Sequence, residues 1–411
     1  MSISVLAPSS GILVTTVIPD GSTSTAGLVR LCENGISTSG RAVQGDDTRL
    51  GNPGSSVLGL ATWAGTGAGG NLTLDGTTAV AWGAWSTIGG VRTLTISVAT
   101  TIEYDEITFD FTTYSSIAIV TKGAKLICRS IVSTGTGTAY VDWNGGDASG
   151  GTAGAGAAVA ATASPFGGGQ TGATGRSTTG MGATAGTYNS GVCLGGLGGA
   201  GGDAGANAGG ASGSFTRDYT PGYSTYGSIV DFLLVGSGKN WASATSLTSY
   251  QLSGGGGGSA GGNQTTGTSG GGGGGGGVVA LFIGVLNMGS NTLYVRSIGG
   301  GGGNGNATLS PGTSGGGGGG GGGAVLVLVA NALSPLVLNA NGGTGGTGST
   351  TDADVADGGV GGSGGLGVCI YGSGSVPTGT ATGGTGGAGS DSTPASSGSN
   401  GTVHIVSAVI A

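Results

Sequence analysis

The run Gly270–Gly277, followed directly by Val278-Val279-Ala280-Leu281-Phe282-Ile283, decides the fold of this chain. A turn through Asn287–Asn291 then leads to a second apolar run, Leu293–Ile298. The same order of glycine run, apolar strand, turn and short strand occurs again in Gly315–Gly323, Ala324–Ala330, Asn331–Pro335 and Leu336–Leu338. A unit that recurs in this way indicates a repeat architecture, so we interpret the repeat before any single residue.

The long glycine runs have two alternative interpretations. Glycine loses more backbone freedom on folding than any other residue, and Gly-rich segments are commonly flexible linkers. Alternatively, the runs adopt the extended helix of three residues per turn, which has no internal hydrogen bonds, and pack side by side where only glycine fits. The direct continuation of Gly270–Gly277 into a strand-like apolar run favours ordered packing.

The composition excludes several classes of protein. Glycine makes up 105 of 411 residues, but there is no Gly-X-Y period, which excludes collagen. A hydrophobic share of 36% with only 7% charged residues argues against disorder. The net charge is −7 and the few basic residues are scattered, so we expect no nucleic-acid partner.

No cofactor or metal site is expected from the side chains that usually form one. Four cysteines lie far apart at Cys32, Cys128, Cys193 and Cys369, and the chain has a single histidine. We see neither a signal peptide nor an apolar stretch long enough to span a bilayer, and therefore expect the chain to start in the cytoplasm of the cell that makes it.

Short strand patterns fill residues 91–131. Alternation begins at Val91–Val98, and further apolar segments follow at Ile102–Phe111, Ile117–Val120 and Lys125–Ile131. Short strands at this spacing indicate an all-β stack whose rungs bury their faces on one another. The predicted fold class is all-β, with β-solenoid-like short strands combined with polyglycine II-type glycine-rich layers in an elongated fibre.

The chain resembles the glycine-rich tail-fibre and receptor-binding (adhesin) proteins of tailed bacteriophages. The similarity lies in STAGLVRL at 24–31, VQGDDTRL at 43–50, EITFDF and SIAIVTKGAKLICRSI within 106–131, GGGGGGGVVALFIG at 271–284, and GGGGGGGGGAVLVLVA with LNANGGTGG within 315–346. One departure is that glycine runs alternate here with apolar strands, which implies a mixed core.

The resemblance implies a division into three regions. Residues 1–60 would attach to the virion or to other tail proteins, 61–143 would form the solenoid-like strands, and 144–411 would form the glycine-rich domain. It further implies location in the virion and assembly as a homotrimer. The partner at the host surface would be a glycan or an outer-membrane protein.

Two groups of residues are candidate receptor contacts. Aromatic side chains crowd residues 213–252, where they either cap the glycine layer or contact a receptor. We interpret the acidic segment near residue 355 as a solvated loop. The alternative is a Ca²⁺ site, although the spacing is not that of an EF-hand. Such a loop at a distal end is also a candidate receptor contact. The candidates are Tyr219, Tyr223, Tyr226, Trp241, Asp352, Asp354 and Asp357.

We do not expect catalysis. A tail-spike depolymerase needs a carboxyl pair, and the sequence places no two of Glu103, Asp105, Glu106 and Asp110 across a groove. His404 lies in an apolar strand without a nucleophile nearby in sequence. The depolymerase and a capsid decoration or head-fibre protein remain as alternative functions. The sequence does not distinguish close packing from flexibility for residues 144–212.

Overall fold

The computed structural model describes residues 64–97, 101–157, 166–184, 192–193, 195–212, 252–265, 267–308, 311–351 and 353–407. Contacts divide the chain into two units, residues 1–60 with Ala411 and residues 61–410, and all described residues belong to the second unit. The described residues contain strands but no helix, and so no helix that could cross a membrane. The predicted attachment segment, 1–60, lies outside the described residues.

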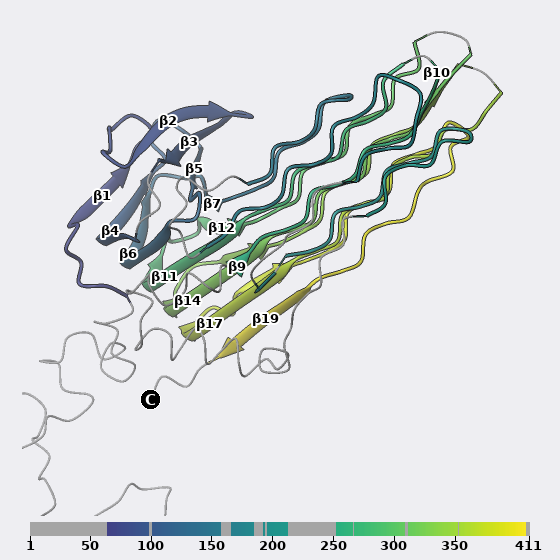
Figure 1. Ribbon diagram of the computed structural model, residues 1–411. Helices are drawn as coiled ribbons and strands as arrows, with labels where there is room; N and C mark the ends of the chain where they lie inside the picture. Colours follow the sequence, from purple (N-terminus) through teal and green to yellow (C-terminus); the bar gives the residue numbers. More distant parts are fainter. Residues whose placement is uncertain are drawn as a thin grey trace, which may run out of the picture. The chain divides into compact units, whose positions relative to one another are not determined.

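One large sheet, which we call sheet A, is parallel throughout. Its seven strands lie in the order β1-β4-β6-β11-β14-β17-β19 (Figure 1). They span Asn71–Leu74, Thr101–Asp110, Lys125–Thr134, Val278–Asn287, Ala324–Ala332, Leu366–Gly374 and Thr402–Ser407, respectively. Strands of a parallel sheet that are covered on both faces have continuous apolar sequences, and Val278–Ile283 of β11 is buried at every residue.

The second large sheet, sheet B, also has seven strands, in the order β18-β15-β12-β7-β5-β3-β2. Neighbouring strands are parallel except for the β2–β3 hairpin. The strands span Thr378–Thr380, Leu336–Asn339, Thr292–Arg296, Thr138–Asp142, Ser116–Val120, Val91–Ile96 and Gly83–Ile88, respectively.

Short turns join the two sheets in a regular way. Strands β6, β11, β14 and β17 of sheet A run directly into β7, β12, β15 and β18 of sheet B. Contacts also join β15 to β17 and β18 to β19 across the sheets. The apolar residues of this double layer form the core, and Leu94, Ile119, Leu126, Val141 and Leu293 are almost completely buried.

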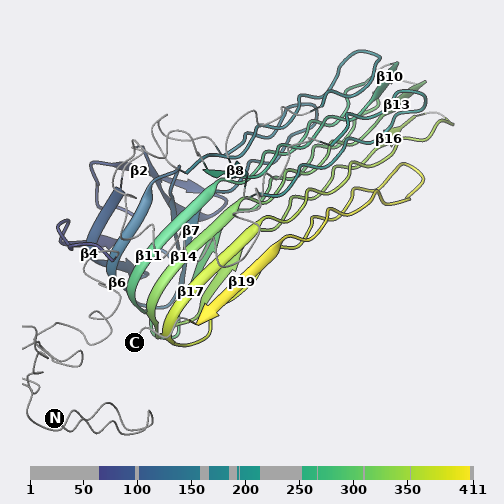
Figure 2. The ribbon, with the colours of Figure 1, turned by 60° about the horizontal axis from the view of Figure 1, so that its bottom comes forward.

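From β7 onward, the chain leaves the sheets through glycine-rich segments between successive strands of sheet A, and these segments run side by side before they return (Figures 1 and 2). The segment Gly270–Gly277 donates backbone hydrogen bonds to three neighbours in turn. Every third donor reaches the same neighbour: Gly270, Gly273 and Gly276 bond to Gly315, Gly318 and Gly321; Gly271 and Gly274 bond to Gly150 and Gly146; Gly272 and Gly275 bond to Ala173 and Gln170.

The carbonyl groups of Gly270–Gly277 accept from three other neighbours with the same period. The donors lie at Gly261, Gly258 and Gly255, at Gly303 and Gly300, and at Gly154 and Ala157. This segment is therefore surrounded by hydrogen-bonded chain on all sides, at 2.7 to 3.0 Å. A three-residue period is that of the extended left-handed helix. We call these mutually bonded segments the glycine lattice.

The lattice has little room for side chains. A Cβ added to Gly274 would lie 1.9 Å from the carbonyl oxygen of Ala155, and one on Gly320 would lie 2.1 Å from that of Gly274. Glycine is required at such positions because the neighbouring main chains approach too closely for any other residue. The lattice buries few apolar side chains, so its cohesion comes from many backbone hydrogen bonds, each worth about 0.5–1.5 kcal/mol net.

The fold class that we predicted, a β-solenoid-like elongated fibre, is wrong. The described strands form two seven-stranded sheets rather than a stack of closed rungs. The reason lies in the connections: from β7 onward, the chain passes through a glycine-rich segment, such as 297–323 or 340–365, before it joins sheet A again. The two sheets also contain strands from both sides of residue 143, because β6 pairs with β11 and β7 pairs with β12.

Candidate functional site

The far ends of the glycine lattice carry polar side chains on a small sheet of their own. Strands β10 (Asn263–Thr265), β13 (Gly312–Ser314) and β16 (Ser349–Thr350) pair antiparallel there (Figure 2). Side chains brace this end: the hydroxyl of Ser314 donates to Oδ1 of Asn263 at 2.9 Å, and Asn207 Nδ2 donates to the Asn263 carbonyl at 3.0 Å. Loops held in this way keep a defined shape for binding.

A cavity of about 320 Å³ lies between three segments of the chain, at residues 201–203, 357–360 and 393–396. Its lining combines backbone with a few polar and small apolar side chains: Gly201, Gly202, Asp203, Asp357, Gly358, Val360, Thr393, Pro394, Ala395 and Ser396. The segments come together through the backbone, since the Asp357 N–H donates to the Asp203 carbonyl at 2.8 Å. Serine and threonine hydroxyls beside carboxylates can exchange hydrogen bonds with a polar ligand.

The carboxylates at this cavity differ in their environment. Burial, together with the negative charges of Asp203 and Asp391, raises the pKa of Asp357. The N–H of Thr393 donates to Asp391 at 2.8 Å and holds the pKa of Asp391 below its usual value. A second carboxylate, Asp203, accepts from the N–H of Gly209 at 2.8 Å. The cavity is therefore acidic and favours ligands with ammonium or hydroxyl groups.

The structure separates the acidic residues that the sequence grouped together. Asp357 lies with Asp203 and Asp391, whereas Oδ2 of Asp354 accepts from Gln264 Nε2 at 3.2 Å. Within the described residues, no group of three His, Cys, Asp or Glu side chains is arranged to hold a metal ion. Five of the predicted contact residues lie outside the described residues: Tyr219, Tyr223, Tyr226, Trp241 and Asp352.

Sequence reasoning missed Asp203 and Asp391. Both follow glycine-rich stretches and precede a turn, and Asp391 is followed by Ser392, a non-glycine residue with a φ of 67°. The sequence signal that could have identified them is an acidic residue at the point where a glycine run reaches a turn. Their separation along the chain concealed that both act electrostatically on Asp357, at a cavity that Asp203 also lines.

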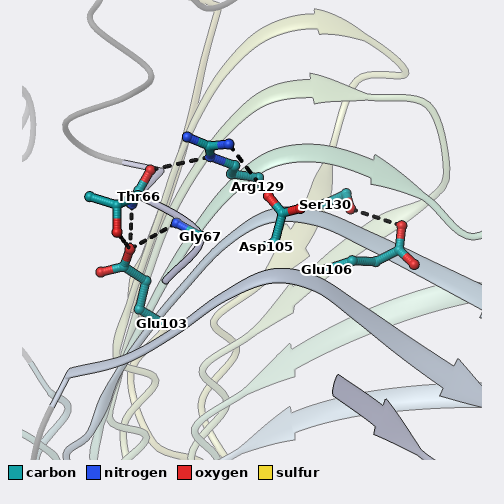
Figure 3. A network of polar contacts seen from close by, with 8 residues as sticks. Thr66, Gly67, Glu103, Asp105, Glu106, Arg129 and Ser130 are labelled. Atoms are coloured by element: carbon teal, nitrogen blue, oxygen red, sulfur yellow. Dashed lines mark hydrogen bonds and ion pairs between the residues drawn. The ribbon is translucent and has the colours of Figure 1, made fainter. Parts of the chain in front are cut away.

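Strand β4 carries the carboxylates that the depolymerase alternative would need, and Figure 3 shows how they are engaged. Glu103 accepts from the backbone N–H and the hydroxyl of Thr66, and from the Gly67 N–H at 3.0 Å. These bonds, of which that from the Thr66 side chain is the strongest, hold the pKa of Glu103 below its usual value. A general acid in glycoside hydrolysis needs a raised pKa.

The other two carboxylates in Figure 3 also have protein partners. Asp105 forms an ion pair with Arg129 at 3.5 Å, and Ser130 donates to Oε2 of Glu106 at 3.2 Å. Arg129 further donates to the carbonyl of Gly65 at 3.4 Å. These contacts tie the segment before β1 to the outer strands of sheet A, which is a structural role.

Comparisons with protein-family models, with curated proteins and with solved structures found no match to this chain.

Proposed function

We propose that this chain is a structural virion protein of a tailed bacteriophage, a tail-fibre or receptor-binding adhesin. The observation that carries the proposal is the placement of polar, braced loops at the turns of a lattice that is rich in glycine elsewhere. A body bonded through its main chain needs little charge and few large side chains, and it can present loops in fixed positions. Under this proposal, the polar residues at the turns of the glycine lattice are the ones that contact the host surface.

Two classes of partner follow from the proposal. Residues 1–60 attach the chain to other virion or tail proteins, and the loops contact the host surface. The acidic cavity lined by Asp203 and Asp357, with the charge of Asp391 nearby, suits a surface glycan that offers hydroxyl or ammonium groups, or a basic segment of an outer-membrane protein. The proposal includes no catalytic step and no cofactor.

Binding of the full-length chain to whole bacteria tests this function. Fluorescently labelled protein is mixed with a panel of bacterial strains, and bound fluorescence is measured by flow cytometry. We expect saturable binding to a subset of strains. The triple variant Asp203→Asn, Asp357→Asn, Asp391→Asn should bind those strains at least about tenfold more weakly.

A matched control removes the same number of charges elsewhere. The variant Asp105→Asn, Glu106→Gln, Asp110→Asn changes β4, and its binding should equal that of the unmodified chain. Absence of binding to every strain, or equal loss in both variants, contradicts the proposal. Release of shortened sugars from host capsule or lipopolysaccharide would favour the depolymerase instead, and antibody labelling over the capsid of intact particles would favour the decoration protein.

A further inference from the structure

Strand β19 forms the margin of sheet A (Figures 1 and 2). Among the described strands it pairs with β17 alone, in parallel register. The N–H of Thr402 donates to the carbonyl of Gly365 at 3.0 Å, so the backbone groups of Thr402 point toward β17. Because these directions alternate along a strand, the backbone N–H and C=O groups of Val403, Ile405 and Ser407 point away from the sheet.

The side chains of β19 are apolar but incompletely covered. In β17, Val368–Ile370 are 0% exposed, whereas their register partners His404–Val406 are half-buried, as is Val403. Natural edge strands are usually protected by Lys, Pro, a bulge or an inward-pointing charge. The sequence of β19, Thr-Val-His-Ile-Val-Ser, contains no Lys, Pro, Asp or Glu.

Residues 390–400, which precede β19 on the same side of the lattice, present polar side chains to solvent, whereas β19 presents mainly apolar ones. Between residues 390 and 400, the exposed residues are polar apart from Pro394: Ser390, Asp391, Ser392, Thr393, Ser396, Ser397, Ser399 and Asn400. A terminal unit of a repeat array needs a polar outer face to remain soluble. The lattice has such a face here, but sheet A, at the same margin, does not. Within the part of the chain that the structure describes, the uncovered edge at this margin is therefore confined to β19.

We propose that β19 is the surface through which two copies of this chain associate, by antiparallel pairing of β19 with β19 of the second copy. Around a two-fold axis perpendicular to the sheet and passing near His404, Val403 of one copy lies opposite Ile405 of the other. Both residues have outward-pointing backbone groups, so they meet as a hydrogen-bonded pair. Their side chains also lie on the same face of the joined sheet, because the pairing keeps the alternation of each strand.

Strand β19 of a second copy is a better partner for β19 than strand β1 of a second copy would be. Strand β19 has no charged Lys, Arg, Asp or Glu that would meet its own copy. Antiparallel pairing also points the two glycine lattices in opposite directions, which separates their polar segments. Strand β1, at the other margin, exposes Asn71 and Thr73, and a contact between β1 and β19 would leave an open edge on each copy and so generate a filament.

This pairing differs from the homotrimer that the resemblance implies, and it does not depend on receptor binding. Light scattering coupled to size-exclusion chromatography separates the two, since one chain has a mass of 38.0 kDa. We expect twice that mass for the purified full-length chain. The variant Ile405→Pro removes an outward N–H and leaves the bonds to β17 in place, so it should elute as a single chain.

A second variant, Val406→Lys, places a charge on the face of β19 away from the core and should also give single chains. Thr380→Lys introduces the same charge on β18, at the margin of sheet B, and should keep twice the mass. Far-ultraviolet circular dichroism verifies that each variant is folded. A mass of one or three chains for the unmodified protein overturns the proposal, as does twice the mass in both β19 variants.

Discussion

The backbone of Gly300 lies so close to Gly146 that a Cβ on Gly300 would stand 1.9 Å from the Gly146 carbonyl oxygen. At the next residue, Gly301, the nearest atom to an added Cβ is the Thr344 hydroxyl, at 3.3 Å. Two adjacent glycines of one segment thus differ in whether a side chain fits.

This difference predicts opposite outcomes for the same substitution. Gly300→Ala must displace a main chain, and we expect it to lower the free energy of unfolding by about 1–3 kcal/mol or more. Gly301→Ala requires only a small movement of the Thr344 side chain. The cost of that movement is offset because alanine reduces the conformational freedom of the unfolded chain, which stabilises the fold by about 0.4–1 kcal/mol. Denaturant unfolding followed by circular dichroism measures both. Equal destabilisation by the two variants would show that the lattice is not packed as described.

The ion pair between Asp142 and Arg296 is the most buried one in the described residues. Arg296 donates to both carboxylate oxygens, at 2.8 and 2.5 Å, and lies 3.8 Å above the ring of Tyr140. The side chain of Asp142 is only 8% exposed. Burial raises the pKa of Asp142, and Arg296 opposes this rise by stabilising the charged form.

Arg296→Met should therefore be strongly destabilising, by about 3–5 kcal/mol, because it leaves a buried carboxylate without its partner. The matched control is Arg129→Met, whose partner Asp105 lies at 3.5 Å with both side chains about half exposed. That change should cost at most about 1 kcal/mol. Comparison of the two unfolding curves tests the prediction, and a smaller loss for Arg296→Met than for Arg129→Met would contradict it.

The apolar runs 278–283 and 324–330 lie in β11 and β14, as expected from their sequences, because a continuous run of β-branched and aliphatic residues suits a buried parallel strand. Their pairing was not visible in the sequence. Strand β11 lies between β14, its neighbour along the repeat, and β6, which precedes a long glycine-rich region. Composition alone did not indicate which segments return to the same sheet, and this is why the solenoid prediction failed.

The candidate site was predictable only in part. The segment near Asp357 was identified by its acidic residues, and the structure places Asp357 at a cavity. Its companions Asp203 and Asp391 are distant in sequence, and only the three-residue period of the lattice brings them into register with it. Such a period leaves no pattern of hydrophobic residues, because the positions that satisfy it are glycines.

We expect that lowering the pH destabilises residues 64–70, the segment before β1, before it destabilises the centre of sheet A. The pKa of Glu103 in the folded chain lies below its usual value of 4.5, so its bonds to Thr66 and Gly67 stabilise the fold at higher pH. That contribution is lost as the pH falls below 4.5 toward the folded pKa. Hydrogen exchange read by mass spectrometry should show faster exchange in residues 64–70 at pH 3.5 than at pH 6, after correction for the intrinsic rate.

Glu103→Gln provides the control for this effect. The amide removes the charge at every pH, so the variant should show the faster exchange in residues 64–70 already at pH 6, with little further change in acid. Strand β14, in the centre of sheet A, should exchange slowly in both proteins at both pH values. A loosening that begins in β14, or one that is equally pH-dependent in the variant, would assign the acid sensitivity to other groups.

Asp357 should have the opposite pH dependence. Its pKa is raised by burial and by the charges of Asp203 and Asp391, so the folded chain holds the proton more tightly than the unfolded chain does. Stability is therefore greatest below the usual aspartate pKa and falls as the pH rises toward the folded value. Asp357→Asn keeps the shape without the charge, and we expect a higher melting temperature than that of the unmodified chain at pH 7. The two melting temperatures should converge near pH 3. Asp391 should behave in the opposite way, because the bond from Thr393 lowers its pKa. We therefore expect Asp391→Asn to have a lower melting temperature than the unmodified chain at pH 7, with a difference that shrinks as the pH falls. Calorimetry of the two variants across this pH range measures both signs.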